Sequence, residues 1–233
     1  MIMRLIKCSA KRIVPRRIKE QVRRFQASRS FRRSMKRFVD DPQSCLEPSN
    51  PTLGELSKAW GNEGWSASTE YLSECIRRAD GAKGPILECG SGLSTLLIAA
   101  TARRKGLSLW SLEHSPEWAS RVRTVLEKYS LHNATVCTVE LRDYGEFVWY
   151  DPPWEQLPQT FSLVVCDGPP AATKGGRYGL AIMKERLHSG CTILLDDAVR
   201  EHEMSVAKRW VGELDAELEV CGEIRQYIEL RIK

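Results

Sequence analysis

The stretch that decides the fold is residues 86–98, which read ILECGSGLSTLLI. An apolar run leads to Glu88 and to two glycines, Gly90 and Gly92, and apolar residues then return at helical spacing. This order predicts a buried strand, a turn that lets a ligand approach the backbone, and a helix. The two glycines match the start of the dinucleotide-binding pattern G-x-G-x-x-G, but Thr95 stands where the third glycine belongs. The spacing therefore predicts a nucleotide-like ligand and leaves its identity open.

From Gly84 onward, short apolar runs alternate with amphipathic segments. This alternation predicts an α/β fold with a doubly wound, mostly parallel, seven-stranded sheet. The last two strands are joined tightly, so we expect them to form an antiparallel hairpin. The predicted strands are 86–90, 107–113, 134–141, 161–167, 191–197, 217–223 and 225–232, and the predicted helices cover about 66–79, 94–104, 116–129, 180–187 and 201–214.

The composition is that of a globular protein of one domain with an appendage. The chain has 233 residues, of which 42% are hydrophobic and 28% charged, enough for a sizeable core. No apolar run approaches the roughly 20 residues that cross a bilayer, and the opening residues lack the apolar stretch of a secretory signal. The cysteines form no C-x-x-C pair and mostly lie inside strand-like runs. We therefore expect buried, reduced thiols and a cytoplasmic protein.

The charge is distributed unevenly along the chain. Residues 1–38 carry fourteen Lys or Arg and one acid, Glu20, for a net charge of +13, whereas the rest carries a net charge of −8. Ile18, Val22 and Phe25 recur at helical spacing among the basic residues, which predicts a basic amphipathic helix. Such a helix suits an anionic membrane surface, a nucleic acid or an organelle-targeting role, or it packs its apolar stripe on the body. We favour the membrane surface among the functional roles.

We divide the chain into three parts. Residues 1–38 form the basic arm, residues 39–60 a linker or entry segment, and residues 61–233 the α/β domain. The boundary rests on residues 40–54, where three prolines and several turn-forming residues predict an irregular loop.

Acidic residues end nearly every predicted strand. In a parallel, doubly wound sheet, ligands bind beyond the carboxyl ends of the strands, at the point where the strand order reverses. A single acid at such a place is often a helix cap or a loop residue, but the whole set favours a binding site. The acids are Glu88, Glu113, Asp143, Asp167, Asp196 and Asp197.

From about Trp60 to its C-terminus, the chain resembles the class I S-adenosylmethionine-dependent methyltransferases. Their first motif, E/D-x-G-x-G, stands here at residues 88–92. The resemblance implies that this turn holds the methionine and sugar of S-adenosylmethionine, with the acid facing the ammonium group. The residues of this part of the expected cofactor site are Glu88, Gly90, Ser91, Gly92 and Ser94.

The family's second signature is an acid that ends the second strand and binds both ribose hydroxyls. Here that acid is Glu113, and a carboxylate offers paired acceptors to a vicinal diol. The resemblance further implies that His114 lies near the adenine, or is an exposed loop residue, and that Asp143 and Tyr144 contact the base. A tyrosine there could stack on the adenine, although Glu140 or Arg142 could be in register instead.

The ends of the fourth and fifth strands resemble those of metal-dependent O-methyltransferases. Asp167 ends one strand, and Asp196 and Asp197 end the next, with Asp197 standing where asparagine is usual. Three converging carboxylates suit a hard cation such as Mg²⁺. The resemblance implies a metal that binds the acceptor hydroxyl. Without a metal, Asp167 is the candidate base.

The loop after the fourth strand resembles that of enzymes that methylate sugars, including glucuronic acid residues. Asp167-Gly168-Pro169 is followed by Arg177-Tyr178, and Trp149-Tyr150-Asp151 precedes it. Arg177 and Tyr178 are therefore expected substrate residues, with Arg177 pairing with a carboxylate or holding the loop by an ion pair. Lys174 is a candidate catalytic base or a solvated loop cation.

These features predict an O-methyltransferase acting on a hydroxyl of a glycan or a hydroxylated small molecule, with a divalent metal. A nucleic-acid methyltransferase using the basic arm is the first alternative, although its usual D/N-P-P-Y/F motif is absent and Asp151-Pro152-Pro153-Trp154 is misplaced for it. A non-catalytic cofactor-binding scaffold and a dinucleotide-dependent oxidoreductase are the others. Trp60, Trp65 and Ser66 precede the sheet. In relatives such a segment closes over the cofactor or the substrate. The alternative is that the tryptophans pack in the core.

Overall fold

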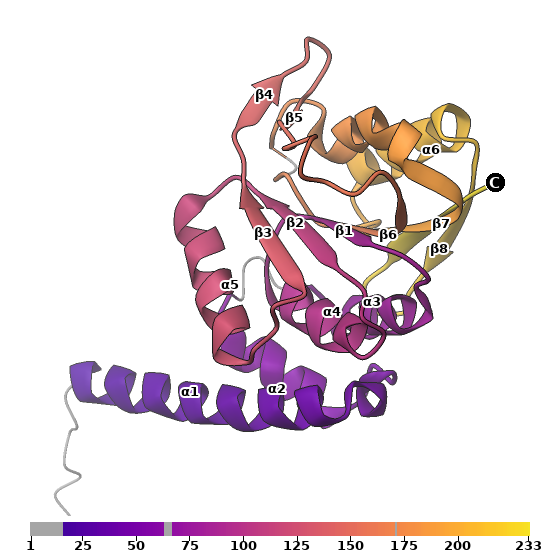
Figure 1. Ribbon diagram of the computed structural model, residues 1–233. Helices are drawn as coiled ribbons and strands as arrows, with labels where there is room; N and C mark the ends of the chain where they lie inside the picture. The colour runs from indigo at the N-terminus through magenta and orange to yellow at the C-terminus, as the bar shows by residue number, and fades with distance from the viewer. Residues whose placement is uncertain (1–15, 63–66, 171) are drawn as a thin grey trace, which may run out of the picture.

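The computed structural model describes residues 16–62, 67–170 and 172–233. A seven-stranded sheet runs through the molecule in the order β3-β2-β1-β6-β7-β9-β8 (Figure 1). The strands β3, β2, β1, β6 and β7 pair in parallel, and β9 pairs antiparallel with both β7 and β8. The strands are β1 (Ile86–Cys89), β2 (Leu109–Glu113), β3 (Ala134–Thr138), β6 (Phe161–Cys166), β7 (Leu187–Leu195), β8 (Ala216–Cys221) and β9 (Tyr227–Ile232).

The chain winds outward from β1 in two directions, through β2 to β3 and then through β6 to β7. The strand order therefore reverses between β1 and β6, which is where such folds bind ligands. The predicted doubly wound sheet with a C-terminal antiparallel hairpin is confirmed.

Helices cover both faces of the sheet (Figure 1). On one face lie α3 (Thr69–Gly81), α4 (Leu93–Arg103) and α5 (Pro116–Lys128), and on the other lie η2 (Gly176–Arg186) and α6 (Glu201–Glu213). Outside α3 and α4, the long α1 (Arg16–Asp40) crosses α2 (Pro51–Trp60) as an additional layer. The short η1 (Pro42–Cys45) connects α1 to α2.

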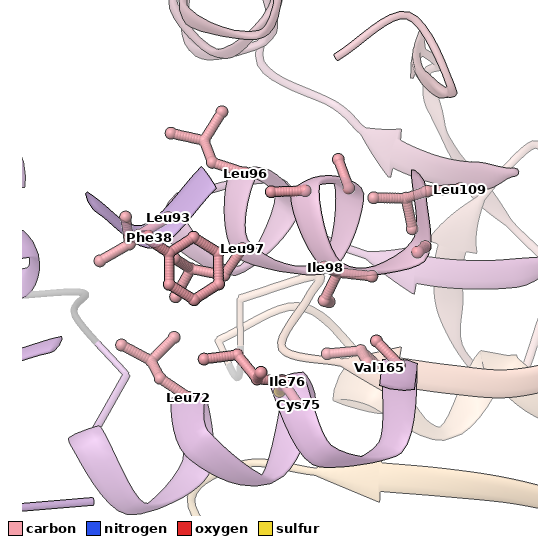
Figure 2. Packing of buried hydrophobic residues seen from close by; sticks show 14 of the residues in the cluster. Phe38, Leu72, Cys75, Ile76, Leu93, Leu96, Leu97, Ile98, Leu109 and Val165 are labelled. Carbon is pink, nitrogen blue, oxygen red and sulfur yellow. The ribbon is translucent and has the colours of Figure 1, made fainter. Parts of the chain in front are cut away.

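The first core lies between the sheet and α3 and α4 (Figure 2). Ser68 starts α3 by accepting a hydrogen bond from the backbone N–H of Tyr71 at 3.1 Å, a normal helix cap. Leu72 and Ile76 of α3 then face Leu97 of α4, with Phe38 of α1 beside them. All four side chains are at most 1% exposed, so the end of α1 belongs to this core.

The structure differs from the sequence prediction in three segments. Residues 40–54 were expected to be irregular, but Pro51 begins α2, with Asn50 capping it through the N–H of Thr52. The strand predicted over 134–141 ends at Thr138, and a separate hairpin of β4 (Leu141–Asp143) and β5 (Val148–Tyr150) follows. The helix expected over 180–187 is the 3₁₀ segment η2, which begins earlier, after Gly175 in the left-handed region (φ 71°).

Two further predictions concern cysteines and membranes. All seven cysteines in the described residues are free thiols, including the five in predicted strands, Cys89, Cys137, Cys166, Cys191 and Cys221. Within the same residues, every helix is too short or too polar to cross a membrane. Trp65 and Ser66, expected near the ligand, lie outside the described residues, and so do residues 1–15 of the arm.

Candidate active site

An open cleft of about 450 Å³ lies beyond the carboxyl ends of the central strands. Its walls come from the residues that follow β1, β2, β6 and β7. A smaller recess of about 40 Å³ adjoins it, between the turn after β1 and the residues Trp60, Asn62, Ala67 and Leu72. Gly90, Ser91 and Asp167 line both spaces, so the turn after β1 and the end of β6 form their shared border.

The turn after β1 requires glycine where two backbones meet. Gly90 has a φ of 88°, and a Cβ there would come within 3.1 Å of the backbone nitrogen of Gly168. A Cβ on Gly168 would collide with the Tyr150 hydroxyl group. Gly92 is different, because its backbone is extended and a Cβ there would meet no protein atom within 4 Å. The space above Gly92 is therefore open to a ligand.

Glu113 links this turn to the end of β2. Its side chain is 6% exposed, and one carboxylate oxygen accepts hydrogen bonds from the backbone N–H of Ser91 at 3.0 Å and from its hydroxyl at 2.9 Å. The other oxygen accepts from the N–H of Ser115 at 2.8 Å and lies 3.3 Å from Nδ1 of His114. Glu113 lines the cleft, so the structure brings it to the predicted position beside the turn.

Glu88 lies beneath the turn rather than in the cleft. It is fully buried, and its two carboxylate oxygens accept hydrogen bonds from the hydroxyls of Ser94 and Thr95, each at 2.6 Å. The Thr95 hydroxyl in turn accepts from the N–H of Gly92 at 2.8 Å. Burial raises the pKa of Glu88 to about 7. Both oxygens of Glu88 are bound by hydroxyl groups of the protein, so Glu88 supports the turn from below. The prediction that Glu88 faces the ligand is therefore not supported by its position.

Aromatic side chains form part of the cleft wall. Trp118 of α5 lines both spaces and donates from Nε1 to the carbonyl of Ser91 at 2.6 Å. The rings of Tyr150 and His114 lie with their centroids 6.2 Å apart, and both residues line the cleft. His114 was predicted to lie there. Trp118 and Tyr150 were not assigned to the cofactor site, and neither were Asn62, Ser115, Arg200 and Arg225, which also line the cleft.

Three acids converge at the ends of β6 and β7. Oxygens of Asp167, Asp196 and Asp197 lie within 4.8 Å of one another. Asp167 is 31% exposed and lines both spaces, and burial, with the neighbouring acids adding to it, raises its pKa to about 7. Burial also raises the pKa of Asp196. Against the effect of burial, the hydrogen bond from Arg225 and the charge of Arg177 hold the pKa of Asp197 below its usual value.

Three arginines compensate these acids. Arg177 lies at their centre, where its Nη2 is 2.8 Å from Asp167 and 3.2 Å from Asp197. Arg200 lies 2.7 Å from one oxygen of Asp197, and Arg225 donates to the other. Both carboxylate oxygens of Asp197 are therefore bound to guanidinium groups. The donor set does not fit a resident divalent cation, because such an ion would have to displace guanidinium groups from the oxygens it needs.

Three predicted site residues lie in or against the β4–β5 hairpin, away from the cleft. The β4–β5 hairpin carries Asp143 outward, where it accepts from the N–H of Gly145 at 2.7 Å, and Tyr144 stacks on Phe147 with ring centroids 5.3 Å apart. Lys174 donates to the carbonyl of Gly145 and lies 3.7 Å from Asp143. None of the three is among the residues that line either space. The reason is that β3 ends early and the hairpin turns these residues away from the strand ends.

Tyr178 packs under α6 instead of facing a substrate. Its hydroxyl donates to Glu213 at 2.7 Å, and Arg209 lies 3.7 Å above its ring. Its carbonyl accepts from Nε1 of Trp210 at 3.1 Å. Tyr178 therefore anchors η2 to α6, and the substrate role predicted for it has no support in these contacts.

Residues 87–198 match a family model described as a methyltransferase domain. The match covers the strands and turns that build the cleft, from β1 to the acids after β7. The segment that builds the cleft therefore matches a methyltransferase domain. The resemblance of the turn at residues 88–92 implies S-adenosylmethionine as the methyl donor. No curated protein matches the sequence.

Solved structures of other methyltransferases share the fold. An O-methyltransferase from Bacillus cereus, in complex with S-adenosylhomocysteine, has a TM-score of 0.55 and 16% identity, covering 85% of this chain and 96% of that one. A Podospora anserina methyltransferase bound to S-adenosylhomocysteine has a TM-score of 0.54 and 20% identity, covering 82% and 88%. The precorrin-6y C5,15-methyltransferase of Geobacter metallireducens has a TM-score of 0.54 and 16% identity, covering 72% and 90%. At these identities the likeness shows the methyltransferase fold and not the acceptor.

Proposed function

We propose that this methyltransferase transfers the methyl group of S-adenosylmethionine to a hydroxyl oxygen of a glycan or another hydroxylated small molecule. The observation that carries the proposal is the pairing of two acids across one cleft. Glu113 offers carboxylate oxygens next to the turn after β1, and Asp167 lies at the shared border of the two spaces. One acid suits a ribose diol, and the other suits a proton acceptor beside the methyl group.

The residues present fit S-adenosylmethionine. The open space above Gly92 and the smaller recess beside Ser91 suit the methionine end. Glu113 would bind the ribose hydroxyls, with His114 and Tyr150 next to the adenine. When bound, S-adenosylmethionine supplies an activated methyl carbon on a sulfonium.

Asp167 is the residue that we propose as general base. Its pKa of about 7 leaves it substantially ionised at neutral pH, where a base is most effective. Asp167 accepts the proton of the acceptor hydroxyl as that oxygen bonds to the methyl carbon, and it later returns the proton to water. Arg177, held 2.8 Å away, fixes the orientation of the carboxylate. No step requires Lys174, which is bound to the hairpin.

The acceptor class rests on the character of the residues that line the cleft. The cleft is lined by the aromatic residues Trp118 and Tyr150 and by the polar residues Arg200 and Arg225. Aromatic faces combined with a few polar groups suit a polyhydroxylated ring. Methyl-transfer assays with sugars, uronates and phenols would identify the acceptor, and transfer to an amine or to RNA alone would contradict the proposal.

The cofactor part of the proposal is tested by calorimetry. We expect S-adenosylhomocysteine to bind the wild type and NAD not to bind. Glu113→Gln should weaken S-adenosylhomocysteine by about 10- to 100-fold, because paired charge-assisted hydrogen bonds are lost. Glu127→Gln, whose carboxylate is 79% exposed on α5, is the matched control. Equal affinity in the wild type and in Glu113→Gln would contradict the proposed ribose site.

We further propose an anionic membrane surface as the partner of α1. The C-terminal half of α1 buries one side in the core and carries exposed basic residues on its other side. Phe25 is 63% exposed, and the guanidinium of Arg29 lies over its ring. An exposed aromatic ring among cationic side chains suits a lipid interface better than a phosphodiester backbone. The basic residues are Arg29, Arg32, Arg33, Lys36 and Arg37.

A further inference from the structure

The three aspartates lie where metal-dependent enzymes of this fold would hold a cation, but the space among them is filled. Arg177 is 3% exposed, and its Nη2 donates to Asp167 at 2.8 Å and to Asp197 at 3.2 Å. A magnesium ion would need carboxylate oxygens at about 2.0–2.1 Å. The guanidinium nitrogen bridges one oxygen of Asp167 and one oxygen of Asp197, in the position between these carboxylates that such an ion would take.

Backbone acceptors fix Arg177 in this position. Its Nη1 donates to the carbonyl oxygen of Asp196 at 2.7 Å, and its Nη2 also donates to the carbonyl oxygen of Asp167 at 3.1 Å. The neighbouring Gly176 has a φ of 51°, and a Cβ there would collide with the ring of His202. Since the loop has so little freedom, the guanidinium is a built-in part of the strand ends.

Arginines also offset three of the four negative charges of this cluster without a metal. Glu203, whose side chain is 0% exposed, lies behind Arg177 with an oxygen 3.9 Å from Nε. Four carboxylates thus surround Arg177, while Arg200 and Arg225 contribute two more positive charges at Asp197. A dication added to this set would carry its own desolvation cost and meet fixed positive charge.

We infer that Arg177 takes the place of the divalent cation in this methyltransferase, and that it acts as a positioning residue for Asp167. The inference rests on the proposed function only for the role of Asp167. Unlike a metal ion, a fixed guanidinium has no open coordination position for the acceptor oxygen. The acceptor's proton therefore passes to a carboxylate, while the new oxygen–carbon bond forms and the carbon–sulfur bond of the donor breaks.

The decisive experiment measures cation binding directly. Wild-type protein is dialysed against chelator and titrated with Mn²⁺ and with Mg²⁺ by calorimetry. We expect no saturable binding tighter than about 1 mM, the weak end of the range for oxygen-ligand sites, and no loss of methyl transfer in chelator. Stoichiometric binding of Mn²⁺ at micromolar concentration, or activity that chelator abolishes and Mg²⁺ restores, would overturn the inference. The wild-type titration decides even if a variant fails to fold.

A gain of binding sharpens the test. Arg177→Met removes the central guanidinium from beside Asp167 and Asp196, while Arg200 and Arg225 still bind Asp197. Mn²⁺ should therefore bind weakly at the freed carboxylates and raise the melting temperature of this variant and not that of the wild type. Arg209→Met, which removes an exposed arginine paired with Glu146 and Glu213, is the control and should gain nothing. If Arg177→Met folds but does not respond to Mn²⁺, Arg177 is not a stand-in for the cation. Calorimetry with S-adenosylhomocysteine on the same samples separates this result from a failure of the proposed function.

The positioning role has its own readout. Without the Arg177 charge, the pKa of Asp167 should rise, because the nearby positive charge lowers it in the wild type. The acidic limb of the kcat profile should therefore move to higher pH in Arg177→Met and return part of the way in Arg177→Lys. A profile that keeps its position while only its height falls would indicate a structural role alone.

Discussion

Arg177 at the cleft and the arginines of α1 use the same side chain in opposite ways. Arg177 is 3% exposed and donates to two carboxylates and two backbone carbonyls. Arg32 and Arg33 on α1 are exposed. A buried guanidinium requires acceptors and becomes part of a fixed geometry, whereas an exposed one acts through a long-range, salt-sensitive field. The net charge of a segment therefore says little about what its arginines do.

The largest effect should come from removing the proton acceptor at the cleft. Asp167→Asn keeps an oxygen for Arg177 but cannot take a proton, so kcat should fall about 10²- to 10⁴-fold while the affinity for S-adenosylhomocysteine changes by less than about tenfold. Because protonation of Asp167 removes the base, the wild-type kcat should fall as pH drops below about 7. Steady-state kinetics against pH, combined with calorimetry, checks both.

Asp215→Asn is the control, since this acid is 81% exposed at the start of β8. An Asp167→Asn enzyme with unchanged kcat would show that the base is another residue.

The second prediction tests whether α1 is an arm or part of the body. Phe38 is 0% exposed and packs with Leu72 and Leu97, so Phe38→Ala should lower the free energy of unfolding by about 3–5 kcal/mol. Phe25, which is 63% exposed on the same helix, is the matched site. Phe25→Ala should change the free energy of unfolding by less than about 0.5 kcal/mol. Urea denaturation measures both. If both substitutions had equally small effects on the free energy of unfolding, residues 1–38 would be an arm separate from the core, as the sequence predicted.

The strand ends could be predicted from the sequence because the signals are local. An apolar run followed by an acid places Glu113 and Asp167 at the carboxyl edge of a parallel sheet, whatever the loops do. The surroundings of these acids were not predictable in this way. Tyr150 reaches the cleft through a hairpin that no alternation in 142–158 marked, and the same hairpin carries Asp143 away. Arg177 follows Asp167 by ten residues, and its contacts depend on the turn at Gly175 and Gly176.

Glu88 illustrates the same limit within one motif. Its place after an apolar run was visible, but the hydroxyls that bind it come from the first turn of α4, at Ser94 and Thr95. A side chain's direction at the end of a strand depends on such partners. This is why the acid of the motif was expected in the cleft and lies beneath it.

The third prediction uses the pH dependence of stability. The folded-state pKa of Glu88 is raised to about 7, so the fold favours its protonated form. Its contribution is then fully present below about pH 4.5 and is lost as pH rises through 7, by at most about 3 kcal/mol. Glu88→Gln should therefore gain stability relative to the wild type between pH 5 and pH 8. Urea denaturation at both pH values measures this, with the exposed Glu127→Gln as control, and a difference that does not vary with pH would contradict the shift.

The smallest effect should come from a single arginine on α1. If α1 binds an anionic bilayer, Arg33→Gln should weaken partitioning onto phosphatidylserine-containing vesicles by about 1 kcal/mol, roughly fivefold, and binding should fall steeply with added salt. Arg104→Gln, at another exposed basic site after α4, should change partitioning much less if the surface is specific to α1. Vesicle sedimentation measures both, with neutral vesicles for comparison. Equal loss in the two variants would mean that only net charge matters, and salt-sensitive binding to RNA in place of vesicles would assign the exposed arginines to a nucleic acid.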